Sequence, residues 1–294
     1  MEIEQLIEGS YDLHVHTGPD VMDRKLTDME MATRLEKLGM KGFGIKSHYF
    51  CTAERARTIN ELSSKVKAYG AISLNNAVGG FNPIAVEMAA RDGAKIVWMP
   101  TVDSKNEMDK FKTGFYKNPP GWAKFKQEML DEGIKSSDLT IYDESGIRDE
   151  VREVLNIISK YNLILATGHL GKKEIFDLVK LSKEKNIKKV VVTHPNFPSI
   201  NLSKEEQKEL AEMGAIMEHC FTTPHTNKMS WNSLYEEIKY VGFEKCILST
   251  DLGQHKAIYP DEGMKIFIEN LIDNDFSKEM ITRMIKDNPS FLVE

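Results

Sequence analysis

Short apolar segments alternate with amphipathic segments along most of the chain. The apolar segments are five to nine residues long and bounded by Gly, Pro, Asn or Asp, which is typical of buried strands. They are expected at residues 11–16, 41–48, 71–75, 94–100, 162–170, 188–195, 214–220 and 245–253. Because apolar residues dominate both alternating faces of these segments, a parallel sheet covered on both sides is favoured.

The intervening segments carry helical periodicity and helix boundaries. Thr27 with Glu30, and Ser203 with Glu206, have the spacing of a capping box, and Asn82 followed by Pro83 is typical of a helix start. Apolar residues at helical spacing, up to Val66, predict a helix that stops shortly before Gly70.

Eight strands alternating with helices over 294 residues predict an α/β fold of the (β/α)₈ TIM barrel class. The alternation is interrupted at 101–148, so we expect a long insertion after strand four that acts as a lid or specificity segment. The remaining helices, up to the C-terminus, would cover strand eight. A single domain over 1–294 is therefore predicted.

Polar residues that can bind a metal ion follow several predicted strands. His14 and His16 are two residues apart, so an extended strand projects them to the same side, with Leu13 and Val15 on the other. The active site of such a barrel lies at the carboxyl ends of its strands. Further candidates at strand ends are Lys46, His48, His169, His194, Glu218, His219 and Asp251. Imidazoles converging from several strands predict a site for zinc, manganese or iron.

The sequence motifs at these strand ends resemble the metal-dependent amidohydrolase superfamily. The resemblance rests on DLHVHT at strand one, ATGHLG at strand five, VVTHP at strand six and LSTDLGQ at strand eight, with DNPSFLVE similar to a terminal helix. It implies a barrel hydrolase with one or two metal ions. His14 and His16 would bind one ion, His169 and His194 would be available to a second, and Asp251 would be both ligand and proton acceptor.

Strand four and strand two depart from the common pattern of that superfamily. Strand four ends in Trp98, Met99 and Pro100, where many two-metal members have a carboxylated lysine. Lys46 and His48 are two apart on strand two and should face the interior together, with His48 a candidate ligand. Lys46 is either carbamylated and bridging, or cationic and bound to an anionic substrate, or paired with a carboxylate.

Strands one, two and six also resemble the polymerase and histidinol phosphatase (PHP) family. Gly253, however, stands where that family has its last histidine. Glu218 and His219 are adjacent in strand seven, so only one of them can face the interior, and period two does not decide which. Both remain candidate substrate-binding residues, together with Lys46.

Composition narrows the classes of partner. The net charge of −6 is spread along the chain, which argues against a nucleic-acid or membrane surface and favours a small-molecule substrate. The N-terminus lacks the pattern of a secretory signal, and Cys51, Cys220 and Cys246 form no CxxC, so we expect buried, reduced thiols in a cytoplasmic protein. A homo-oligomer is compatible with this class of enzyme.

The function predicted from the sequence is metal-dependent hydrolysis. A metal-activated water would cleave an amide, cyclic amide, lactone or ester of a small molecule, with Asp251 as general base and zinc, manganese or iron as cofactor. The alternatives are a PHP-like phosphoesterase, a metal-dependent decarboxylase and a metal-binding barrel without catalysis.

Overall fold

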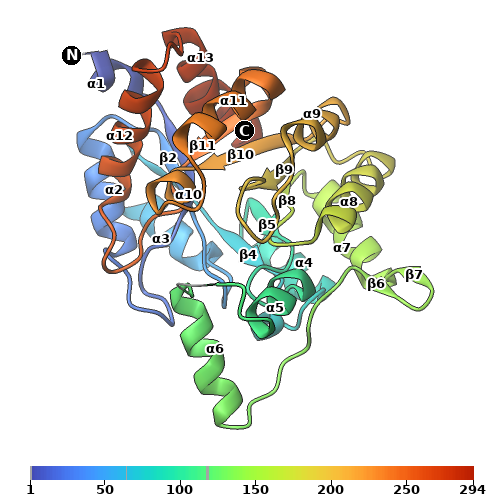
Figure 1. Ribbon diagram of the computed structural model, residues 1–294. Helices are drawn as coiled ribbons and strands as arrows, with labels where there is room; N and C mark the ends of the chain where they lie inside the picture. Colours follow the sequence, from blue (N-terminus) through green and yellow to red (C-terminus); the bar gives the residue numbers. More distant parts are fainter. Residues whose placement is uncertain (1, 64, 117–118) are drawn as a thin grey trace.

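The computed structural model describes residues 2–63, 65–116 and 119–294, and it has an α/β fold with its strands in the interior and helices around them (Figure 1). Each predicted strand is confirmed in its place along the chain. The strands are β1 Tyr11–Val15, β2 Gly42–Ile45, β3 Lys67–Tyr69, β4 Ala71–Ser73, β5 Ile96–Trp98, β8 Ile164–Ala166, β9 Val190–Thr193, β10 Ile216–Cys220 and β11 Cys246–Ser249.

Helices separate the consecutive predicted strands, as the periodicity indicated. Between or after strands lie α2 Asp28–Lys37, α3 Ala53–Leu62, α4 Pro83–Arg91, α7 Asp149–Lys160, α8 Lys172–Glu184, α9 Lys204–Glu212, α10 Thr222–His225, α11 Trp231–Val241, α12 Pro260–Ile272, α13 Lys278–Thr282 and α14 Asn288–Val293. The capping boxes of α2 and α9 and the Asn82–Pro83 start of α4 are confirmed. Short elements complete the series: α1 Glu2–Ile7, η1 Asn76–Val78, η2 Phe243–Lys245 and η3 Arg283–Asp287.

The prediction that a helix continues to Val66 is wrong. Helix α3 ends at Leu62, and its C-cap residue Ser63 has an extended backbone, so Val66 leads into β3 instead. Residue 64 lies outside the described residues. Strand three accordingly begins earlier than expected, as β3 and β4 with Gly70 between them. A Cβ at Gly70 would lie 2.5 Å from the Cα of Ala53, which explains a glycine at this crossing.

The strands form a three-stranded sheet, β1-β2-β3, and a six-stranded sheet, β11-β10-β9-β8-β5-β4. Every pair within these two sheets is parallel. The sheets adjoin at one edge through Gly70 and at the other through the segment after β11, where Asp251 N donates to His14 O at 2.9 Å and His16 N donates to Leu252 O at 2.8 Å. The carboxyl ends of β1 and β11 therefore lie side by side.

The first strand deviates from regular alternation. Leu13 packs in the inner apolar cluster with Trp98, whereas Val15 packs in the outer cluster between sheet and helices, so the prediction that Leu13 and Val15 share a face is wrong. The register with β2 shifts between Asp12 and Val15. Such an irregularity re-aims side chains, and here it brings Leu13 and His14 both to the interior.

The segment 101–148 carries its own short elements. These are α5 Lys105–Lys112, α6 Gly121–Asp131 and an antiparallel hairpin of β6 Tyr142–Asp143 and β7 Gly146–Ile147. Helix α6 stands apart from the strands and helices of the main body in Figure 1. Residues 117 and 118 of the predicted insertion lie outside the described residues. Within the described ranges, no helix combines the length and apolar character needed to span a membrane.

Candidate metal centre

Five histidine side chains form a closed ring of neighbouring imidazoles at the carboxyl ends of the strands. They are His14, His16, His48, His169 and His194. Successive ring centroids around this circle lie 5.6, 4.9, 6.2, 4.9 and 5.9 Å apart. The five side chains are buried. We refer to them as the histidine ring.

Burial and the Lys46 charge oppose protonation of His14, but the Glu218 and Asp251 charges outweigh them and raise its pKa. Burial keeps the other four imidazoles neutral. It lowers the pKa of His16 to about 3, with the nearby Arg24 charge adding to the effect. It also lowers the pKa of His48 and His194 well below the ordinary value, and that of His169 despite the opposing Glu107 charge. A neutral imidazole has a nitrogen lone pair available for a metal ion.

Asp251 reaches the ring from the end of β11. Its Oδ1 atom lies 3.2 Å from Nε2 of both His14 and His16, and its Oδ2 accepts a hydrogen bond from Thr222 Oγ1 at 3.0 Å. Burial opposes ionisation of this carboxyl, but His14 and His16 hold its pKa well below the usual range. Asp251 is therefore a carboxylate at neutral pH.

The backbone at two site residues adopts an uncommon conformation. Asp251 has φ +52° and His194 has φ +26°, both in the left-handed region that non-glycine residues seldom occupy. Such conformations cost of order 1–3 kcal/mol each and concentrate at functional sites. Their presence at the ends of β11 and β9 marks these positions as specialised.

Lys46 lies in the interior beside the histidine ring. The side chain is 1% exposed, and Nζ is 2.8 Å from His14 Nε2 and 5.0 Å from the centroid of the Trp98 ring. Burial lowers the pKa of Lys46, although the Asp251 and Glu218 charges oppose the effect. Lys46 and His48 face the interior together, since the His48 imidazole contacts that of His16.

The choice between Glu218 and His219 is decided by their contacts. Glu218 Oε2 lies 3.1 Å from His14 Nδ1, and Glu218 Oε1 accepts a hydrogen bond from Ser249 Oγ at 2.9 Å. His219 Nδ1 instead lies 3.3 Å from Asn196 Nδ2, outside the histidine ring. Glu218 is thus brought to the site, and His219 is not.

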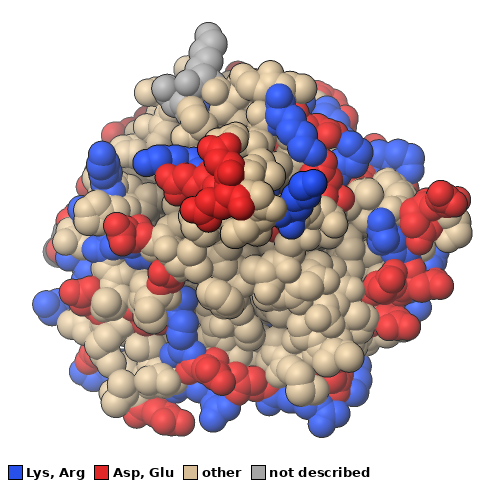
Figure 2. All heavy atoms as spheres, turned by 90° about the horizontal axis from the view of Figure 1, so that it is seen from below, with Lys and Arg blue, Asp and Glu red and all other residues tan. Residues whose placement is uncertain are grey.

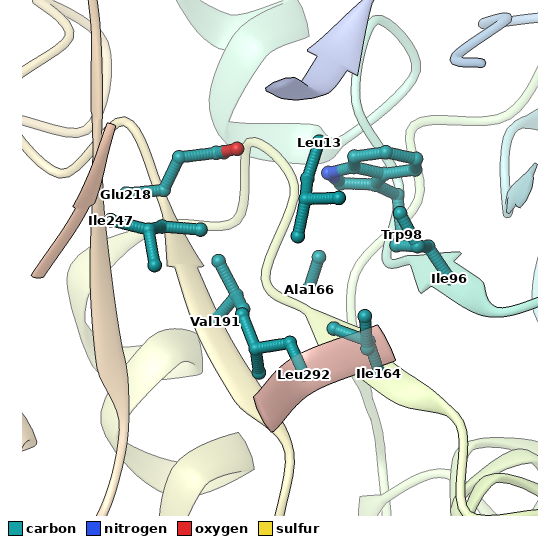
Figure 3. A pocket seen from close by; sticks show the side chains of 9 residues that line it. All are labelled: Leu13, Ile96, Trp98, Ile164, Ala166, Val191, Glu218, Ile247 and Leu292. Carbon is teal, nitrogen blue, oxygen red and sulfur yellow. The ribbon is translucent and has the colours of Figure 1, made fainter. Parts of the chain in front are cut away.

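An apolar cavity underlies the site on the side of the C-terminal helix. Figure 3 shows Leu13, Trp98 and Val191 around it, with Leu292 of α14 below and the Glu218 carboxylate at its edge. This apolar layer separates the charged groups from solvent on that side. In the face seen in Figure 2, uncharged side chains occupy the middle and charged ones of both signs surround them.

The donor set fits a divalent metal ion. One donor atom each from His14, His16 and Asp251 lie within 4.8 Å of one another, and so do donor atoms of His14, Glu218 and Cys220. Among the described residues, the buried Nδ1 atoms of His16 and His194 have no hydrogen-bond partner. Imidazole and carboxylate donors suit zinc, manganese or iron.

The sequence matches the model of a family of unknown function (DUF6282) over residues 9–218. The chain belongs to this family. No curated protein sequence matches this DUF6282 chain.

Solved structures of hydrolases have the same fold. An amidohydrolase from Pseudomonas aeruginosa superimposes with a TM-score of 0.69 at 12% identity, covering 99% of this chain and 97% of that one. A probable 2-pyrone-4,6-dicarboxylic acid hydrolase from Acinetobacter baumannii, with citric acid bound, gives 0.59 at 12% identity, with 97% and 99% covered. A lactonase from Listeria monocytogenes gives 0.55 at 13% identity, with 99% and 96% covered. The resemblance to amidohydrolases is thereby confirmed for the fold.

Gly253 permits the close approach of β1 and the segment after β11. A Cβ at this position would lie 1.7 Å from His16 O, and its φ is +122°. A histidine at the corresponding PHP position therefore cannot be accommodated on this backbone. Trp98, which ends strand four, packs against His14 with ring centroids 5.4 Å apart.

Two buried carboxyl groups at the site escaped the sequence prediction. Asp12 accepts hydrogen bonds from the backbone N and Oγ1 of Thr250, beside Asp251, and burial raises its pKa to about 7. Glu107 lies 3.3 Å from His169 Nδ1. Asp12 precedes His14 by two residues in strand one, a spacing that could have indicated a position on the same side of the strand. Nothing near Glu107 in the sequence distinguishes it from an acidic residue on a helix surface. Of the cysteines, Cys220 and Cys246 are buried, as expected, and Cys51 is half-buried; all three are free.

Proposed function

We propose that this chain is a metal-dependent hydrolase that cleaves an amide, cyclic amide, lactone or ester bond of a small molecule. The observation that carries the proposal is the closed histidine ring with the Asp251 carboxylate against two of its members. Random core packing would place aliphatic side chains at these strand ends instead. The structural neighbours are an amidohydrolase, a probable dicarboxylic acid hydrolase and a lactonase, which supports the reaction class.

We further infer that the two sheets close into a (β/α)₈ barrel, with 101–148 as its lid. The backbone contacts at both sheet edges support closure. In such a barrel the histidine ring stands at the catalytic face.

His14, His16 and Asp251 would hold one ion, and His48, His169 and His194 would provide donors for a second or complete the first. A divalent ion there supplies a Lewis acid that acidifies water towards pKa ~7 and polarises the scissile carbonyl.

The protein groups around the histidine ring would transfer protons, orient His14 and bind an anionic part of the substrate. Asp251 is ionised at neutral pH, so its carboxylate can accept a proton from the attacking water and return it to the leaving group. Glu218 Oε2, 3.1 Å from His14 Nδ1, would hold the proton on Nδ1 and leave the Nε2 lone pair for a metal ion. Lys46, when protonated, offers a cation to an anionic part of the substrate.

The PHP-like alternative is disfavoured because Gly253 cannot be a histidine on this backbone. A decarboxylase would use the same donors, but only hydrolysis incorporates oxygen from solvent into the product. Turnover of an ester and lactone panel in ¹⁸O-labelled water therefore separates these reactions.

The direct test is Asp251→Asn beside the exposed control Asp273→Asn. We expect Asp251→Asn to keep its fold and most of its bound metal while kcat falls at least about 100-fold, the lower range of a lost general base. The control should retain activity. Normal turnover by Asp251→Asn would refute the role of Asp251, and a wild type inactive on the whole panel would refute the proposed function.

A further inference from the structure

The segment after β5 buries a carboxylate against one member of the histidine ring. Glu107 lies in the first turn of α5 and is 0% exposed. Its Oε2 atom is 3.3 Å from His169 Nδ1 and accepts a hydrogen bond from Ser199 Oγ at 2.7 Å, while Oε1 accepts one from the hydroxyl of Tyr116. Three segments distant in sequence thus converge on one carboxylate.

The same turn of α5 also holds the backbone of His169. Ser104 Oγ donates to His169 O at 2.9 Å, and Asn106 Nδ2 donates to that oxygen at 3.1 Å and to Ser199 O at 2.9 Å. Residues at the start of α5 therefore hydrogen-bond the backbone carbonyl of His169 and also lie beside its imidazole. This arrangement exceeds what capping of α5 requires, because Ser104 alone caps the helix through Glu107 N.

The charge on Glu107 is stabilised by these neighbours. Burial by itself disfavours the charged form, but the His169 ring and the Ser199 and Tyr116 hydroxyls bring the pKa of Glu107 below its ordinary value. A buried carboxylate is costly unless such donors surround it. Among the described residues, no group forms a hydrogen bond of ordinary geometry with His169 Nδ1, and Glu107 Oε2 is the carboxylate oxygen that lies 3.3 Å from it.

We propose that Glu107 is a positioning residue that fixes the tautomer and ring orientation of His169. With the proton on Nδ1 facing Glu107, the lone pair is on Nε2, on the opposite side of the imidazole, where it can serve a metal ion. Glu107 and Tyr116 both belong to the 101–148 segment, so the packing of that segment and the orientation of the His169 ring are coupled. The metal-binding part of this inference rests on the proposed function.

A second buried glutamate provides a matched control. Glu174 also anchors the 101–148 segment, because its carboxylate accepts hydrogen bonds from Thr140 Oγ1 at 2.7 Å and Ile141 N at 3.0 Å. Its hydrogen-bond partners include no histidine. Glu174→Gln therefore weakens the anchoring of the segment without touching the ring.

The first test measures Co²⁺ binding by the full-length wild type, Glu107→Gln and Glu174→Gln, by chelator competition and visible absorption. We expect Glu107→Gln to bind Co²⁺ about 10 to 100 times more weakly, with an altered absorption band, and Glu174→Gln to bind like the wild type. Tyr116→Phe removes one hydrogen-bond donor to Glu107, so its Co²⁺ affinity should lie between those of Glu107→Gln and Glu174→Gln. Equal affinities for Glu107→Gln and wild type, or an equal loss in Glu174→Gln, would overturn the positioning role.

The second test needs no metal. ¹⁵N NMR of the histidine rings, with His169→Gln to assign the resonance, should show His169 protonated on Nδ1 in the wild type and shifted towards Nε2 protonation in Glu107→Ala. An Nε2-protonated His169 in the wild type would overturn the inference. A wild type that binds no Co²⁺ but shows the Nδ1 tautomer would refute the proposed function and leave the positioning of His169 supported.

Discussion

Replacing Gly253 with alanine should damage both stability and the metal centre. The added Cβ would lie 1.7 Å from His16 O on a backbone with φ +122°. A left-handed conformation costs an L residue about 1–2 kcal/mol, and relief of the overlap by backbone shifts costs about 1–3 kcal/mol more. We therefore expect the free energy of unfolding to fall by roughly 2–5 kcal/mol. Displacement of His16 from Asp251 should also weaken metal binding.

Gly214→Ala separates these two contributions. Gly214 has φ +111°, but a Cβ there would have no neighbour within 4 Å. The control should lose only about 1–2 kcal/mol and bind metal normally. Urea unfolding measures both variants. If Gly253→Ala loses no more stability than Gly214→Ala and keeps its metal affinity, the close packing of β1 against the segment after β11 is not as described.

Three further changes test other parts of the site. Burial lowers the pKa of His219 to about 3, below its unfolded value of about 6.5, so the unfolded state binds more protons in that window and stability falls as pH falls. Between pH 7 and 5, the free energy of unfolding of His219→Gln should therefore fall by about 2 kcal/mol less than that of the wild type. Urea unfolding at several pH values measures this, and an equal dependence of stability on pH in both proteins would contradict it. Lys46→Met should raise KM for an anionic substrate about tenfold, which corresponds to ~1.4 kcal/mol. The variant should keep the metal-to-protein ratio of the wild type, whereas a lower ratio would identify a carbamylated, bridging lysine. Glu218→Gln should weaken metal binding about 10- to 100-fold, and calorimetric titration showing wild-type affinity would exclude an orienting role for Glu218.

The strand order could be predicted because each strand is a short apolar run, and most of these runs are followed by a polar residue. The rule that parallel strands end at one face then predicts that His48, His169 and His194 lie near His14. The structure brings these imidazoles into one ring. Regular alternation was sufficient here, since the four residues come from different strands and need only point inward.

The remaining features depend on three-dimensional contacts that periodicity does not encode. The register shift in β1 turns Leu13 inward and breaks the two-residue rule for that strand. Glu218 and His219 are both buried polar residues, so burial alone could not separate them. Glu107 reaches His169 only because α5 begins beside the end of β8, a distance of 62 positions in sequence.

Metal analysis of the purified protein tests the central claim most directly. The wild type, stripped with a chelator and incubated with zinc, manganese or iron, should retain at least one equivalent of one of these metals. Asp251→Asn should retain most of it, and His14→Ala should lose it, because His14 belongs to both candidate groups of donors. A wild type that takes up none of these metals, or a His14→Ala variant that binds as well as the wild type, would contradict the account.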